Sequence, residues 1–169
     1  MKKIAGIILG FFFSLTILAQ NNVNYRLLAK RNEDGTVQLK WLSQQLYNKN
    51  TKFFIERKQK GKFIAINQTP IQFGKNDWET SSDDVKFIKT IVEDNDYLNL
   101  EGIIQLTIFI QAVKNNDFAS YLGVYYKDED KLKGKLTYRL LNENKEVLAE
   151  TVLEDKVNAE VEGFELVAN

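Results

Sequence analysis

Apolar and polar residues alternate with a period of two along much of the chain, as in strands that bury one face. The clearest run is TVQLKWL, in which Val37, Leu39 and Trp41 share one face. Turn-forming residues such as Asp34-Gly35 separate the runs. The pattern predicts strands at about 25–30, 36–42, 52–58, 63–66, 124–126, 136–140 and 147–153. Short strands in this arrangement indicate an antiparallel all-β fold.

The period changes between about residues 75 and 116, where we predict a helical insert. Ser82-Asp-Asp-Val85 is typical of a helix start, and Val85, Ile88 and Val92 recur at helical spacing. A short helical turn closed by Gly123 follows the insert.

The run at 100–113 inside this insert fits both periods. The helical stripe comprises Ile103, Leu106, Ile110 and Val113, and the strand-like set comprises Ile104, Leu106, Ile108, Ile110 and Ala112. We favour a helix because the run is long for a strand, which typically has about five or six residues.

The N-terminus has the layout of a secretory signal peptide. Lys2 and Lys3 precede the apolar run 4–18, and Ala19 offers a cleavage site. The alternative is a membrane anchor, but the run is short for a span of about 20 residues. We therefore predict that residues 1–19 are removed, that the mature chain has no membrane span, and that it is extracellular, at the cell surface or periplasmic.

The mature chain suits a single domain, at about residues 23–155. Residues 164–168 of the terminal VEGFELVAN repeat the rhythm of residues 25–29. Residues 156–169 then represent a linker and the first strand of a second repeat, and the alternative is an ordinary C-terminal tail.

The composition excludes most catalytic chemistry. The chain has no His and no Cys, which leaves no Ser-His-Asp or Cys-His nucleophile, no disulfide and no imidazole or thiolate zinc site. The acidic clusters lie at 83–84, 93–96 and 128–130 among polar residues, where we expect solvated turn acids. We therefore predict a protein that is not an enzyme and has no catalytic residues.

Two of these clusters contain the Asp-x-Asp with which a calcium loop starts, at Asp94 and Asp96 and at Asp128 and Asp130. Leu98 and Leu132 occupy the next ligand position, and an apolar side chain offers no oxygen. We predict no metal and no cofactor. The 23 basic and 23 acidic residues balance, which argues against nucleic-acid binding.

Three groups of motifs occur in a consistent order: Val37-Gln-Leu-Lys-Trp41, then Phe53-Phe-Ile-Glu-Arg57 with Gly61-Lys-Phe63, then Tyr125-Tyr-Lys-Asp128 with Tyr138-Arg-Leu140. In this order the chain resembles a bacterial secreted fibronectin type III domain over about residues 23–153, apart from the insert. The resemblance implies an immunoglobulin-like sandwich of seven strands in two antiparallel sheets. One departure is Leu136, which stands where the family tends to place the Tyr that locks the corner before its sixth strand.

The resemblance implies a non-enzymatic interaction or spacer module with a protein or polysaccharide partner, since this fold does not specify one ligand. The alternative is an accessory carbohydrate-binding module of a secreted polysaccharide-degrading enzyme. Trp78, which has polar neighbours, and Tyr97 are the candidate partner or sugar contacts. The other interpretation of Trp78 is that it anchors the insert to the sandwich.

Overall fold

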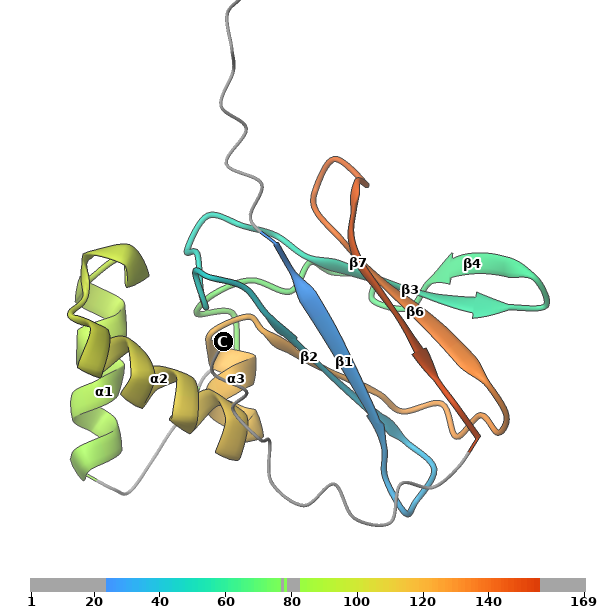
Figure 1. Ribbon diagram of the computed structural model, residues 1–169, viewed down its shortest axis with the longest axis horizontal. Helices are drawn as coiled ribbons and strands as arrows, with labels where there is room; N and C mark the ends of the chain where they lie inside the picture. Colours follow the sequence, from blue (N-terminus) through green and yellow to red (C-terminus); the bar gives the residue numbers. More distant parts are fainter. Residues whose placement is uncertain (1–23, 77, 79–82, 156–169) are drawn as a thin grey trace, which may run out of the picture.

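The computed structural model describes residues 24–76, 78 and 83–155. Within these residues, seven strands form two antiparallel sheets (Figure 1). The first sheet has the order β1-β2-β5, with β1 at Arg26–Arg31, β2 at Val37–Leu42 and β5 at Tyr125–Asp128. The second has the order β4-β3-β6-β7, with β3 at Phe54–Gln59, β4 at Lys62–Ala65, β6 at Leu136–Leu141 and β7 at Val147–Leu153. The predicted mostly β, sandwich-like architecture is confirmed.

The alternating positions of the strands supply the core between the sheets. Val37, Leu39 and Trp41 of β2 are buried, as the period of two predicts, and Trp41 packs edge-on against Phe53 at 5.4 Å between ring centroids. β4 pairs with β3 through a two-residue turn in which Lys60 and Gly61 both have positive φ. This is the turn whose twist matches a hairpin. In immunoglobulin constant domains, by contrast, the fourth strand belongs to the sheet of the first.

The helices lie between β4 and β5 in the chain and gather at one end of the two sheets (Figure 1). They are α1 at Asp83–Asp94, the 3₁₀ turn η1 at Tyr97–Asn99, α2 at Gly102–Lys114 and α3 at Asn116–Tyr121. The helix predicted for the ambiguous run at 100–113 is confirmed. Its buried residues, however, are Ile108 and Ala112, whereas Ile103, Leu106 and Ile110 of the predicted stripe are exposed.

A lysine of the first sheet holds the C-terminal end of α2. The ammonium group of Lys40, on β2, donates hydrogen bonds to the carbonyl oxygens of Ala112 and Val113 at 2.9 and 2.7 Å. A cation at this end of a helix satisfies carbonyls that lack intrahelical partners and opposes the negative end of the helix dipole. The insert is therefore fixed to the sheet by a polar contact as well as by packing.

The insert closes on itself where it leaves and rejoins the sheets. The amide of Gly74 donates to the carbonyl of Tyr121 at 2.8 Å. Gly123, with φ of +73°, ends α3, and a Cβ atom there would lie 2.6 Å from the carbonyl carbon of Gln72. Only glycine fits both the backbone conformation and this approach of two main chains.

The signal peptide at 1–19 and the linker and second repeat at 156–169 lie outside the described residues and remain predictions. Among the helices that the structure describes, none combines the length and the apolar character needed to cross a bilayer.

Candidate functional site

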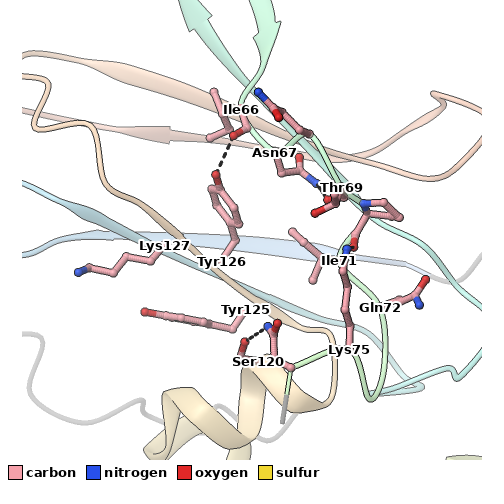
Figure 2. A pocket seen from close by; sticks show the side chains of 13 residues that line it. Ile66, Asn67, Thr69, Ile71, Gln72, Lys75, Ser120, Tyr125, Tyr126 and Lys127 are labelled. Atoms are coloured by element: carbon pink, nitrogen blue, oxygen red, sulfur yellow. Dashed lines mark hydrogen bonds between the residues drawn. The ribbon is translucent and has the colours of Figure 1, made fainter.

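A cleft of about 430 Å³ lies where the insert meets the sheets (Figure 2). One side is β5, represented by Tyr125, Tyr126 and Lys127, and the other is the segment that follows β4, residues 66–72. Lys75 and Ser120 close one end. The volume falls in the range of about 300–1,000 Å³ that is usual for small-ligand sites.

The wall opposite β5 is held in place by one buried amide. Asn67 accepts a hydrogen bond from the backbone amide of Ile55 at 2.6 Å and donates to the carbonyl of Thr69 at 2.9 Å. Ile71 pairs with Phe53 through two backbone hydrogen bonds of 2.8 and 2.9 Å. These bonds fix the irregular segment to the start of β3 in the second sheet, so the cleft is preformed.

Two further hydrogen bonds set the ends of the cleft. The hydroxyl of Tyr126 donates to the carbonyl of Ile66 at 2.8 Å, and Figure 2 shows this side chain reaching across from β5. At the other end, Asn76 donates to the hydroxyl of Ser120 at 2.6 Å, which joins the start of the insert to α3. The cleft is therefore bounded by contacts between segments that are distant in sequence.

The charged residues that line the cleft are both lysines. Its charged lining residues are Lys75 and Lys127, and no carboxylate lines it among the described residues. Lys75 donates to the carbonyl of Pro70, and Lys127 forms an exposed ion pair with Glu129 at 3.0 Å. Burial, followed by the charges of Asp117 and Glu129, raises the pKa of Tyr125, so its phenol stays neutral at pH 7. The arrangement can bind a ligand by hydrogen bonds and ring contacts.

The structure places both candidate contacts from the sequence away from this cleft and inside the core. Trp78 is 4 % exposed and Tyr97 is 7 % exposed. Trp78 packs against Phe118 at 4.7 Å between ring centroids, and Tyr97 packs edge-on against Tyr47 at 5.4 Å. Neither ring presents a face on which a sugar could stack. The contacts of Trp78 fit its alternative interpretation as an anchor of the insert.

The two rings belong to one aromatic cluster. Phe73 connects them, because it contacts Tyr47 at 5.3 Å and Tyr121 at 5.2 Å, and Tyr121 in turn contacts Trp78. The Tyr47 hydroxyl donates to the carbonyl of Asn95, and burial raises its pKa to about 12. The cluster joins η1, α3 and the segments that link them to the sheets into one core, which the isolated motifs in the sequence did not indicate.

The acidic residues at 128–130 include one buried carboxylate, Asp128, and one exposed carboxylate, Asp130. The prediction of solvated turn acids is wrong for Asp128, which is buried and accepts hydrogen bonds from Arg57 at 2.5 Å and from the hydroxyl of Tyr138 at 2.9 Å. Asp130 pairs with the other terminal nitrogen of Arg57 at 2.8 Å. No group of three or more metal-ligating side chains converges in the described part of the chain.

A second surface lies on the insert. Ile103, Leu106 and Ile110 of α2 are 67, 44 and 38 % exposed and share one face of the helix, because they are spaced by three and four residues. Phe87 of α1 and Leu98 of η1 are also exposed. Large apolar side chains repeated along one exposed helix face are typical of a contact surface.

Comparison of the chain with models of known protein families, with curated proteins and with solved structures gave no significant match. The fold and the two surfaces therefore carry the functional argument. Sequence reasoning missed the cleft, because its walls come from segments about 50 residues apart in the chain, on either side of the insert. The adjacent Tyr125 and Tyr126 were the one local signal for it.

Proposed function

We propose that this protein is a non-enzymatic interaction module of an exported protein, built on a fibronectin type III-like sandwich, and that the insert provides its contact surface. The seven strands in two antiparallel sheets support the resemblance, as does Trp41 in the core. Tyr138 of β6 is fully buried and bonds to Asp128, whereas Leu136 replaces the corner tyrosine. The hydrogen bond of Tyr138 joins β6 to β5 in the interior.

The observation that carries the proposal is the orientation of α2. Its Ile108 and Ala112 face the core, while Ile103, Leu106 and Ile110 face solvent. A helix that only covered the end of the sandwich would place polar residues on its outer face. Exposing isoleucine and leucine there has a cost in solubility, which a protein partner that covers them would offset.

The described residues also support a binding role over a catalytic one. Every tyrosine in the chain has a raised pKa, so none supplies a phenolate near pH 7. The buried carboxylate of Asp128 is paired with Arg57. The carbohydrate-binding alternative based on Trp78 and Tyr97 has no support from their placement, because stacking on a sugar requires an exposed ring.

A photo-crosslinking amino acid at position 106 tests the proposal in the organism that produces the protein. We expect a defined protein adduct, identified by mass spectrometry, which disappears in a variant that also carries Ile103→Ser and Ile110→Ser. The same crosslinker at Val147, an exposed apolar residue on β7, is the matched control. An identical adduct pattern at both positions, or no adduct at 106, would contradict the proposal.

Export is tested separately, by sequencing the N-terminus of the protein recovered from the culture medium and the cell envelope. Cleavage after Ala19 predicts that the mature chain begins at Gln20. A full-length chain that starts at Met1 and stays inside the cell would contradict the exported part of the proposal.

A further inference from the structure

The free edge of β5 opens onto the cleft. Within the described residues β5 pairs with β2 alone and so forms one edge of its sheet. Tyr125, Tyr126 and Lys127, which make up most of β5, also line the cleft. An edge strand carries a row of main-chain donors and acceptors without strand partners, which is a template for another strand.

The register shows which main-chain groups face the cleft side. The amide of Trp41 donates to the carbonyl of Val124 at 3.2 Å, and Leu39 lies opposite Tyr126. In an antiparallel pair the residues alternate between those that bond to the neighbouring strand and those that point away from it. The N–H and C=O groups of Tyr126 therefore point toward β2, and those of Tyr125 and Lys127 point toward the open edge.

The side chains of β5 divide between two faces. Figure 2 shows Tyr125 and Lys127 extending in the same direction, whereas Tyr126 turns toward Ile66. A strand added at this edge would continue the same alternation. Its outward residues would lie beside Tyr125 and Lys127, and its inward residues beside Tyr126 and the apolar side chain of Ile71.

The charged residues of the cleft indicate which side chains an added strand should carry. Lys75 and Lys127 are its charged lining residues, and no carboxylate lines it in the described part of the chain. Glu129, the partner of Lys127, is exposed, and an exposed ion pair is weak enough to exchange its partner for a carboxylate of a ligand. An acidic residue at the outward position beside Lys127 therefore fits best, because the negative charges of Asp117 and Glu129 already act on Tyr125.

We propose that this cleft binds an extended peptide segment of a partner protein by strand addition to β5. The segment alternates acidic residues, which lie beside Lys127, with apolar residues, which pack toward Tyr126 and Ile71. This site is separate from the exposed face of α2, so it adds a second kind of contact to the proposed interaction module. The main-chain hydrogen bonds supply affinity and the alternation supplies specificity.

A library of random peptides displayed on phage and selected on the wild-type protein provides the probe. We expect enriched peptides that alternate acidic and apolar residues, and binding of a synthetic copy that isothermal titration calorimetry can measure. Lys127→Pro removes the outward N–H and leaves the bonds to β2 intact, since proline is tolerated where an edge N–H faces solvent. It should weaken binding at least about tenfold, because it also blocks the edge sterically. Lys127→Ala, the matched control, keeps the N–H and should lose less affinity than Lys127→Pro.

A second measurement leaves the protein unchanged, in case Lys127→Pro fails to fold. Two peptides are compared, each N-methylated at every second amide but at opposite positions. Methylation of the amides that bond to β5 should abolish binding, and methylation of the amides that point away from β5 should preserve it. Leu106→Ser on α2 should leave peptide affinity unchanged, so failure of the α2 surface and failure of this cleft are distinguishable.

Four outcomes would overturn the proposal. The first is that no peptides are enriched, and the second is that the two methylation patterns have equal effects. The third is a glycan that binds in the cleft and depends on Tyr125 but not on the outward N–H of Lys127. The fourth is an edge-to-edge dimer of this chain that Lys127→Pro dissociates.

Discussion

Arg57 of β3 and Asp128 of β5 form a buried ion pair that joins the two sheets, with 2.5 Å between their closest nitrogen and oxygen atoms. The hydroxyl of Tyr138, on β6, donates to the same carboxylate oxygen at 2.9 Å. A buried charge is tolerated when its partner and additional hydrogen bonds satisfy it. Three strands from both sheets therefore depend on one carboxylate.

Asp128→Asn should destabilise the protein by about 3–5 kcal/mol, because it leaves the guanidinium of Arg57 buried without a full countercharge. Asp130→Asn is the matched control, since Asp130 contacts the same arginine but is exposed, and it should cost no more than about 1 kcal/mol. Urea unfolding followed by circular dichroism measures both. Equal losses of unfolding free energy in the two variants would contradict the claim that the buried ion pair stabilises the protein more than the exposed one.

The two faces of α2 should respond differently to the same change. Ile108→Ala removes a fully buried side chain and should cost about 2–5 kcal/mol. Ile103→Ala, on the exposed face of the same helix, should change the free energy of unfolding by no more than about 0.5 kcal/mol. Thermal and urea unfolding of the two variants would disprove this orientation of the helix if Ile103→Ala were the more damaging.

Gly123→Ala should be strongly destabilising for two reasons. Its φ of +73° is unfavourable for alanine, and the added Cβ would lie 2.6 Å from the main chain of Gln72. Gly74 has φ of +68° with no atom near the position of a Cβ, so Gly74→Ala isolates the conformational part, about 1–2 kcal/mol. Gly123→Ala should exceed that control by about 1–3 kcal/mol. Similar losses would mean that the two main chains can separate without cost.

Stability should fall at alkaline pH because of the tyrosines. Burial raises the pKa of Tyr47 from 10.0 to about 12, and also raises the pKa values of Tyr121 and Tyr138. The folded chain therefore holds these protons more tightly than the unfolded chain. This contribution is fully present below pH 10 and is lost as pH rises from 10 through about 12.

Phenolate absorbance measured against pH, with and without concentrated urea, tests this prediction. The folded chain should ionise at higher pH than the unfolded chain, and the transition should coincide with the loss of tertiary circular dichroism. Coincident titration curves in the two conditions would contradict the raised pKa values.

The strands could be predicted from sequence because each buries one face. Val37, Leu39 and Trp41 carry enough contrast with Gln38 and Lys40 to fix both the period and the inward side. α2 lacks that contrast, since isoleucines occupy most of its circumference. Its helical length was readable, but its buried face was not, because tertiary packing decided which isoleucines meet the core.

One half of the buried ion pair could have been predicted from the sequence, and the other half could not. Arg57 follows Ile55 by two residues, which places it on the inward face of β3 and requires a buried anion. Asp128 stands in an acidic run that looks solvated when it is considered alone. The cleft was still harder to predict from the sequence, because neither of its walls indicates the other until the fold brings residues 66–72 beside β5.

The hydrogen bond between Gly74 and Tyr121 has an evolutionary consequence. Because the entry and exit of the insert meet at this bond, the length of chain between them can change without separating the two ends. We therefore expect relatives to vary in the length of the insert and in its exposed residues, and to keep the residues that pack in the common core, such as Ile108 and Phe118. The sheets and the exposed part of the insert should therefore diverge at different rates.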